Sequence, residues 1–267
     1  MKVHVLGSGS GGNAVVLDTG RERVLVDAGF SPRRLKERMQ RVGLTPESVS
    51  ALIITHEHGD HICGARFAAA RWNWPVYATA GTLQGGRWRK ARVEAVEPRR
   101  ELAFEDLSFR FVRTPHDARE PVAIVATARS SGARVGIAYD LGHATPRFVN
   151  HFTEVDVLLL EANHDDEMLR TGPYPWPVKQ RVAGMRGHLS NHAAGAMARA
   201  CVHGELRHIV LCHLSQTNNV PEVAMRAVRG ALRGSGFRGT MHAADQDVPL
   251  SVSVSHGRSS AQLSLAI

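Results

Sequence analysis

The chain of 267 residues is predicted to fold as an α/β protein in which strands outnumber helices. Short apolar runs typical of strands recur along the sequence, and stretches with helical apolar periodicity occur between them. Histidines and acids follow several of the apolar runs, as they do in sheet proteins with a site at strand ends. With 43% hydrophobic residues, the chain is able to build a sizeable core.

Ten segments carry the strand signal, which is enrichment in apolar and β-branched residues over a short length. Each is bounded by polar residues, glycine or proline. In chain order the predicted strands cover residues 2–6, 14–18, 23–27, 51–55, 75–79, 107–112, 121–127, 134–139, 155–161 and 208–213.

Three longer segments, 31–43, 190–204 and 221–234, carry the helix signal. In the first, apolar Leu35, Met39 and Val42 share one face, Ser31 is placed to cap the start, and Gly43 suits the exit. The second repeats this design, with Ser190 as the cap and Gly204 as the stop. The face that it presents for burial consists of Ala194, Met197, Ala198 and Cys201.

The organisation along the chain predicts one domain over residues 1–250, because no Pro/Gly/Ser-rich linker divides it. Residues 251–267 are expected to form a C-terminal strand or tail. No apolar run reaches the roughly 18 residues that cross a bilayer, and three cysteines without a CxxC spacing suit a reducing compartment. We therefore expect a cytoplasmic protein with no membrane partner.

The formal net charge of +8 favours a polyanionic partner such as nucleic acid. The excess is almost entirely arginine, a bias that genome composition also produces. The densest basic stretch, GGRWRKARVEAVEPRR, places Trp88 among Arg87, Arg89 and Lys90. These three cations are candidate substrate-binding residues, since an aromatic side chain among cations suits a nucleic-acid path. A solvated loop is the alternative.

The stretch THEHGDHICG concentrates His56, His58, Asp60 and His61 directly after an apolar run. Other polar residues also stand at the ends of apolar runs, where side chains of a sheet converge; they are Asp27, His116, Asp140, Glu161 and His213. Imidazole and carboxylate ligands without thiolate suit Zn²⁺, Mn²⁺ or Fe²⁺. Two separate groups of ligands suggest two ions with an acid between them.

The pattern H-x-H-x-D-H at residues 56–61 resembles the signature of the metallo-β-lactamase superfamily. Asp27 in VLVDAG, His116 in TPHDA, Asp140 in IAYDLG and His213 in LCHLS follow in the order which that superfamily uses. The resemblance implies an αββα sandwich, in which two mixed β-sheets pack together with helices outside.

The resemblance also implies roles for these residues. His56, His58 and His116 would hold one ion, and Asp60, His61 and His213 the other, with Asp60 also among the catalytic residues. Asp140 would bridge the two ions, and Asp27 would orient a ligand or its loop. A hydroxide bridging the two ions would be the nucleophile, so hydrolysis is the expected chemistry.

A narrower similarity extends from residue 1 to about residue 248. The segments GSGSGGN, HDAREPV, EANHDDEMLRTGPYPWPVKQRV, GHLSNHAAGAMA and LCHLSQTNN resemble the YycJ/WalJ family. That family consists of metal-dependent 5′-to-3′ exonucleases linked to bacterial DNA repair. The resemblance implies a di-metal phosphodiesterase acting on DNA, with zinc or manganese as the cofactor.

The segment GHLSNHAAGAMA also resembles a region of ribonuclease Z in which a histidine before a helix lies beside the phosphate. His188 is therefore the candidate general acid, and Glu161 is its candidate partner. A histidine that merely contacts the backbone of a capping loop is the alternative. Weaker candidates for substrate contacts are Ser10 and Asn13, in the glycine-rich opening, and His164.

Three alternatives to a DNA phosphodiesterase remain open. A thioester or lactone hydrolase of the glyoxalase II type shares the metal motifs, and a ribonuclease Z-like enzyme would process RNA. A nucleic-acid-binding protein with a vestigial site is disfavoured, because a structural site needs only about four ligands. The sequence leaves open DNA against RNA, the end polarity, the metal and the oligomeric state.

Overall fold

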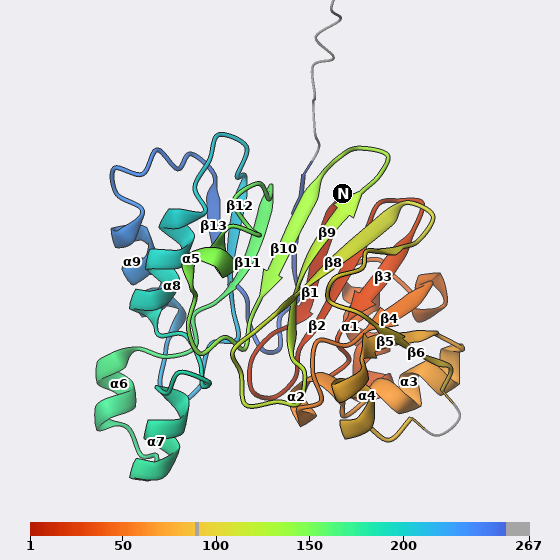
Figure 1. Cartoon of the computed structure of the whole chain (residues 1–267), viewed down its shortest axis with the longest axis horizontal. Helices are drawn as coiled ribbons and strands as arrows, with labels where there is room; N and C mark the ends of the chain where they lie inside the picture. Colours follow the sequence, from red (N-terminus) through yellow and green to blue (C-terminus); the bar gives the residue numbers. More distant parts are fainter. Residues whose placement is uncertain (89–90, 255–267) are drawn as a thin grey trace, which may run out of the picture.

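Buried strands from both halves of the chain build two sheets that face each other. The structure is a computed structural model that describes residues 1–88 and 91–254. Its described residues form two seven-stranded sheets with helices on their outer faces (Figure 1). The predicted αββα sandwich of two mixed sheets is confirmed. Arg89, Lys90 and residues 255–267, which include most of the expected C-terminal segment, lie outside the described residues.

The first sheet is built mainly from the N-terminal half of the chain. Antiparallel pairs join β1 to β14, β1 to β2 and β2 to β3, and parallel pairs continue from β3 to β6. In spatial order the strands are β14 (Leu250–Ser253), β1 (Lys2–Gly7), β2 (Ala14–Asp18), β3 (Arg23–Val26), β4 (Ala51–Ile53), β5 (Val76–Thr79) and β6 (Val93–Val96).

The second sheet has a related arrangement. Strands β7 to β10 pair antiparallel, whereas β10 to β13 run parallel. In spatial order the strands are β13 (Thr240–Ala243), β12 (His208–Cys212), β11 (Val157–Glu161), β10 (Arg134–Ala138), β9 (Val122–Ala128), β8 (Leu107–Arg113) and β7 (Leu102–Ala103).

The core between the sheets consists of the inward-facing residues of both. Val5, Leu17 and Val26 of the first sheet belong to the same buried cluster as Ile124 and Leu159 of the second. Central strands such as β2 and β11 are buried along their whole length, as expected for strands covered on both faces. Burial of this apolar surface is the main stabilising contribution to the fold.

Helices cover the outer face of the first sheet, and α1 and α3 contribute Leu35, Met39 and Ala68 to the cluster buried there. The hydroxyl of Ser31 accepts a hydrogen bond from the backbone N–H of Arg34, which confirms the predicted cap of the first helix. The elements of this layer and of its connections are α1 (Pro32–Arg41), η1 (Pro46–Ser48), α2 (Gly59–Ile62), α3 (Ala65–Trp72) and α4 (Ala80–Gly85).

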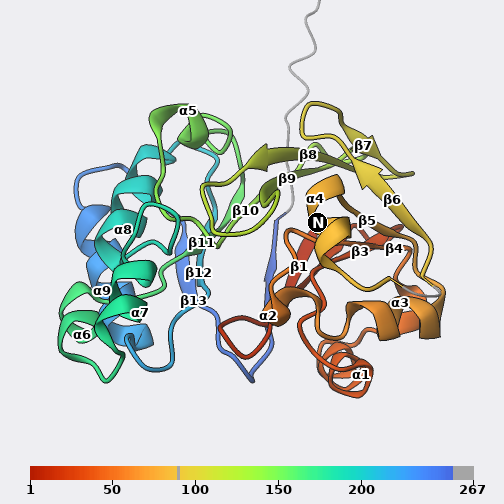
Figure 2. The ribbon, with the colours of Figure 1, turned by 60° about the horizontal axis from the view of Figure 1, so that its bottom comes forward.

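The other predicted helices cover the second sheet. Ser190 caps α8, and its helix packs closely against α9 on the outer side of β11 and β12 (Figure 2). Phe152, Met197 and Val228 are buried in the cluster that these elements share. The elements of this layer and of its connections are α5 (Pro146–Val149), α6 (Asp166–Thr171), α7 (Trp176–Val182), α8 (Asn191–Ala200) and α9 (Pro221–Ala231). Among the described residues, no helix has the length and apolarity required to cross a membrane.

All ten predicted strand segments contain a strand, and all three predicted helices form. Unpredicted among the described residues are the edge strands β6, β7 and β13, six α-helices and the 3₁₀ helix η1. The missed strands β6 and β13 have no fully buried residue, so they lack the apolar signal of the predicted strands.

Two glycines test the packing of α8 on α9. A Cβ at Gly195 in α8 would lie 2.8 Å from the Cβ of Ala231, whereas a Cβ at Gly230 in α9 would meet no atom within 4 Å. We expect Gly195→Ala to lower the free energy of unfolding by about 1–3 kcal/mol through overpacking. Gly230→Ala should raise it by up to about 1 kcal/mol, because alanine has the better helix propensity. Urea denaturation followed by circular dichroism measures both, and equal effects would contradict this packing.

Candidate metal centre

The candidate site lies at one edge of the sandwich, where strands of both sheets end. Asp27 follows β3, the His56 loop follows β4 and His116 follows β8. Asp140 and His213 follow β10 and β12, and Glu161 is the last residue of β11. Helix α2, which carries Asp60 and His61, occupies this edge between the two halves (Figure 1). The predicted convergence of strand ends therefore occurs.

The backbone bends sharply at three of these positions. Asp27, Asp140 and His213 have φ values of 59°, 56° and 54°. These values lie in the left-handed region that residues other than glycine seldom adopt. Asn73 is the remaining such residue among those described. Strained backbone of this kind persists where the surrounding structure enforces it, which is common at functional sites.

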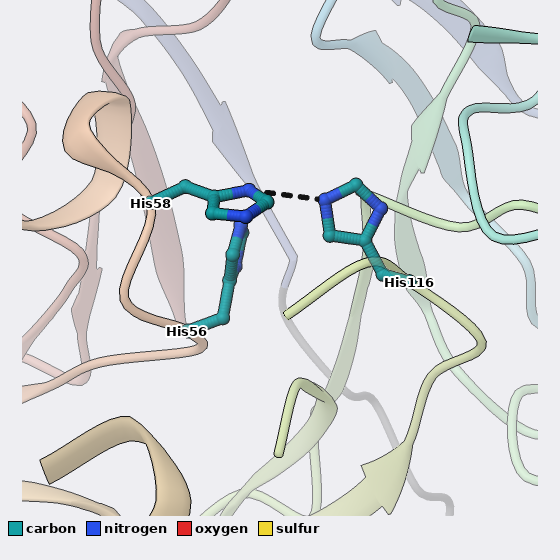
Figure 3. A group of neighbouring side chains, drawn as sticks. All are labelled: His56, His58 and His116. Atoms are coloured by element: carbon teal, nitrogen blue, oxygen red, sulfur yellow. Dashed lines mark hydrogen bonds between the residues drawn. The ribbon is translucent and has the colours of Figure 1, made fainter. Parts of the chain in front are cut away.

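The first donor group contains His56, His58 and His116 (Figure 3). One nitrogen from each ring lies within 4.8 Å of the others, and His116 Nε2 is 3.2 Å from His58 Nδ1. His116 Nδ1 donates to the carbonyl oxygen of Gly187 at 3.0 Å, so Nε2 is the nitrogen that faces its neighbours.

The second donor group contains Asp60, His61 and His213. Asp60 Oδ2 lies 3.4 Å from His61 Nε2 and 3.1 Å from His213 Nε2. His61 is completely buried and His213 is 2% exposed, while Asp60 is partly exposed. The group therefore has a dry inner side and an accessible outer side.

Asp140 lies between the two groups. Its Oδ2 is 2.9 Å from His61 Nε2, and its Oδ1 is 3.6 Å from His213 Nε2 and 3.8 Å from His116 Nε2. His56, His61 and Asp140 form a further set of donors within 4.8 Å of one another. One carboxylate thus contacts histidines of both groups.

The chemistry of these donors fits divalent cations. His56 Nε2 is buried and has no hydrogen-bond partner in the described part of the chain, although a buried nitrogen normally has one. Burial would raise the pKa of Asp140, but His213 and His61 outweigh burial and hold it well below its usual range. Burial would lower the pKa of His213, but Asp140 and Asp60 raise it to about 10. The carboxylates thus demand positive charge here, which cations in place of protons would supply.

Asp27 holds the second group from behind. It is completely buried, its Oδ1 accepts the backbone N–H of Thr55, and its Oδ2 accepts the hydroxyls of Thr55 and Tyr139. Its Oδ2 also lies 2.8 Å from His61 Nδ1. This contact leaves Nε2 of His61 directed at Asp60 and Asp140, so the position suits the orienting role implied for Asp27.

The glycine-rich opening supports the same group. Asn13 is 1% exposed, and its amide nitrogen lies 3.4 Å from Asp60 Oδ2 and 3.2 Å from His61 Nε2. Ser8 donates its hydroxyl to Asn13 and accepts the backbone N–H of His213 at 2.9 Å. Ser10, in contrast, is exposed. Asn13 therefore lies behind the donors, and Ser10 lies at the surface.

His188 and Glu161 contact each other beside these two donor groups, and with Asp140 and His213 they form a further set of donors within 4.8 Å of one another. His188 Nδ1 is 2.7 Å from Glu161 Oε1 and 3.4 Å from Asp140 Oδ1. Glu161 also accepts the backbone N–H groups of Leu141 and Leu189. Burial alone would lower the pKa of His188, but the Glu161 carboxylate raises it above its ordinary value. The pair therefore favours a charged imidazolium next to the site.

The remaining candidates belong to none of the donor groups. His164 is 2% exposed and forms a backbone bridge with Ser190, which positions the loop that carries His188. Arg87 is exposed and lines a surface pocket of about 270 Å³ together with Arg66 and Trp88. Cys63, close to Asp60 in the chain, also lines this pocket.

Sequence reasoning missed four supporting residues: Ser8, Thr55, Tyr139 and Asn163. The amide of Asn163 donates to the carbonyl oxygen of His213 at 2.9 Å. Thr55 and Tyr139 directly precede His56 and Asp140, so their places in the chain were the available signal. A threonine or a tyrosine at these positions does not by itself predict a contact with Asp27. That contact depends on how β4 and β10 approach β3 in space.

Comparison with known proteins identifies relatives over most of the chain. Residues 7–178 match the family model of the metallo-beta-lactamase superfamily. The chain is 31% identical to the exodeoxyribonuclease YycJ of Bacillus anthracis, covering 87% of this chain and 89% of that protein. It is 34% identical to the exodeoxyribonuclease WalJ of Streptococcus pneumoniae D39, covering 84% and 85% of the two chains. The metallo-beta-lactamase fold protein YhfI from Bacillus subtilis superposes with a TM-score of 0.72 at 19% identity, covering 94% and 98%.

The position of Asp27 generates a prediction about metal affinity. Asp27→Ala should weaken zinc binding by about 10- to 100-fold, because His61 loses the partner that fixes its orientation. Tyr139→Phe should have a smaller effect, since it removes one of several contacts with Asp27. Competition with a chromophoric chelator measures the affinity.

Asp18→Ala is the matched control. Asp18 is a buried carboxylate that pairs with Arg23, and it is the last residue of β2, whereas Asn13 of the site precedes the first. Equal zinc affinity in Asp27→Ala and Asp18→Ala would contradict the orienting role.

Proposed function

The chain belongs to the metallo-β-lactamase superfamily and is a metal-dependent hydrolase, and we propose that it is a phosphodiesterase that degrades DNA from a 5′ end. Support comes from relatives that are named exodeoxyribonucleases and that match this chain over most of both lengths. The observation that carries the proposal is Asp140, which lies within 4 Å of histidines from two donor groups while His188 and Glu161 stand beside it.

In this proposal seven side chains would hold two divalent cations, zinc or manganese. His56, His58 and His116 would hold one, Asp60, His61 and His213 would hold the other, and Asp140 would contribute to both. When bound, the cations would supply Lewis-acid stabilisation of a phosphodiester and activation of a water molecule. Asp27, Asn13 and Ser8 keep the donors in their orientation.

The roles of the protein side chains follow from their contacts. Glu161 occupies Nδ1 of His188, which leaves Nε2 as the atom able to deliver a proton to a departing oxygen. His188 is partly exposed, with 16% of its side chain accessible, so substrate is able to reach it. Ser10 and Arg87 are exposed, and we assign them to contacts with phosphates along the strand.

A digestion experiment tests the reaction and its polarity. Oligonucleotides labelled at the 5′ or the 3′ end are incubated with the protein and Mn²⁺ or Zn²⁺, as DNA and as RNA. The proposal predicts early release of the 5′ label from DNA as mononucleotide, and a ladder of shortening products from the 3′-labelled strand. Hydrolysis of a glutathione thioester without hydrolysis of bis-p-nitrophenyl phosphate would instead establish the thioesterase alternative.

His188→Ala should separate proton donation from phosphate binding. The variant should lose about 10²- to 10⁴-fold in kcat on DNA, because the alkoxide leaving group departs without a donor. Hydrolysis of bis-p-nitrophenyl phosphate should change little, since p-nitrophenolate departs without protonation. Metal content should remain that of the unaltered protein.

His143→Ala is the matched control. His143 lies on a neighbouring loop, where its Nδ1 is 2.9 Å from the carbonyl oxygen of Met185. It belongs to none of the donor groups. If His188→Ala loses activity equally on both substrates, His188 does not act as a proton donor, and a role in binding the phosphate remains.

A further inference from the structure

Helices α6 and α7 form an arm between β11 and α8 that extends beyond the sheets (Figure 1). The arm is braced at its base, where Asp165 caps α6 and donates its own backbone N–H to the carbonyl oxygen of Asn218 at 2.9 Å. Lys179 of α7 donates to the carbonyl oxygen of Arg170 in α6 at 2.7 Å, which ties the two helices together. The arm therefore has a defined orientation relative to the site.

The inner end of the arm touches the candidate site. The carbonyl oxygen of Val182, the last residue of α7, accepts the backbone N–H of His188 at 2.8 Å. Arg181 donates to Asp117 Oδ2 at 2.9 Å, and Asp117 Oδ1 is 3.3 Å from His116 Nε2. Helix α7 thus begins away from the donors and ends beside them.

The outer end of α7 presents a tryptophan to solvent. Trp176 is the first residue of the helix, and it is 67% exposed, the largest value among the large hydrophobic residues that the structure describes as exposed. Pro175 and Pro177 flank it and restrict the backbone on both sides. Its indole is therefore held out on a stiff support and buries little apolar surface of its own.

The segment that carries Trp176 is rich in cations, two of which are paired: Arg170 with Glu167, and Arg181 with Asp117. Residues 168–188 contain Arg170, Lys179, Arg181 and Arg186 and no aspartate or glutamate. An aromatic face among cations binds the bases and phosphates of a nucleic-acid strand, and stacking tolerates any base. A protein partner would be expected to need a broader apolar surface than one indole.

We propose that Trp176 stacks on an unpaired base of the strand that enters the site, so that the enzyme acts on single-stranded ends. This inference rests on the proposed nuclease function. Trp176 and Val182 are six residues apart on one helix, which corresponds to about 9 Å at about 1.5 Å per residue. That length matches about three stacked nucleotides at about 3.4 Å each. The stacked base therefore lies a few nucleotides from the scissile phosphate.

Steady-state kinetics on a single-stranded oligonucleotide test this inference. Trp176→Ala should raise KM by about 5- to 150-fold, the effect of losing one base stack, with little change in kcat. Trp176→Phe should restore most of the affinity, because phenylalanine retains an aromatic face. Phe67→Ala is the matched control, because Phe67 is a 52% exposed aromatic residue on α3, in the opposite helix layer.

Substrates with one abasic position identify the stacked base. In the unaltered protein, one abasic position near the 5′ end should raise KM by the same factor as Trp176→Ala. The same substrate should cause no further loss in Trp176→Ala. Unchanged KM in Trp176→Ala, or losses that multiply when the variant and the abasic substrate are combined, would overturn the inference.

Two further measurements keep the outcomes distinct. Hydrolysis of bis-p-nitrophenyl phosphate should be equal in the unaltered protein and Trp176→Ala; its absence from both would contradict the proposed function itself. Size-exclusion chromatography at several concentrations should give one elution volume for both proteins. If the unaltered protein forms a dimer that Trp176→Ala does not form, and KM is the same in both proteins, the indole serves self-association. That result would overturn the base-stacking role.

Discussion

Three carboxylates buried at one edge of the sandwich set the constraint on which the rest of the site depends. Asp27 and Glu161 are 0% exposed and Asp140 is 3% exposed. Buried negative charges are unfavourable unless cations or hydrogen bonds compensate them. Histidines supply that compensation here, and the raised pKa of His213, about 10, expresses the demand for positive charge. A site of this kind suits a cofactor that brings more positive charge than protons do.

The fold meets this constraint by ending strands of both sheets at the same edge. Asp27, Asp140 and His213 adopt the left-handed region just after β3, β10 and β12. Asp27 and Asp140 both contact His61, and Asp140 also approaches His213. The apolar core between the sheets fixes the distance between the two halves. It thereby sets the spacing within the first and the second donor group, because each takes donors from loops of both sheets. His188 reaches Glu161 because α7 and α8 hold its loop from both sides.

The sequence was sufficient to predict the elements whose signals are local. Leu35 and Met39 repeat at a helical period, Ser31 and Ser190 cap their helices, and the strand runs are apolar enough to recognise. Contacts between distant segments carried no such signal. Tyr139 ends a predicted strand, and only the structure shows that its hydroxyl donates to Asp27, 112 positions away in the chain. The exposure of Trp176 was also not predictable from the sequence. A tryptophan between two prolines is compatible with burial or exposure, and the positions of the surrounding helices decide between them.

Metal stoichiometry tests the central claim, that Asp140 joins two cation sites into one centre, most directly. The protein and its Asp140→Ala variant are equilibrated with excess Zn²⁺ or Mn²⁺, freed of unbound metal and analysed by mass spectrometry for metal per chain. We predict two ions in the unaltered protein and at most one in the variant, because both donor groups lose the carboxylate between them. Two ions retained by Asp140→Ala, or a single ion in the unaltered protein, would contradict the account.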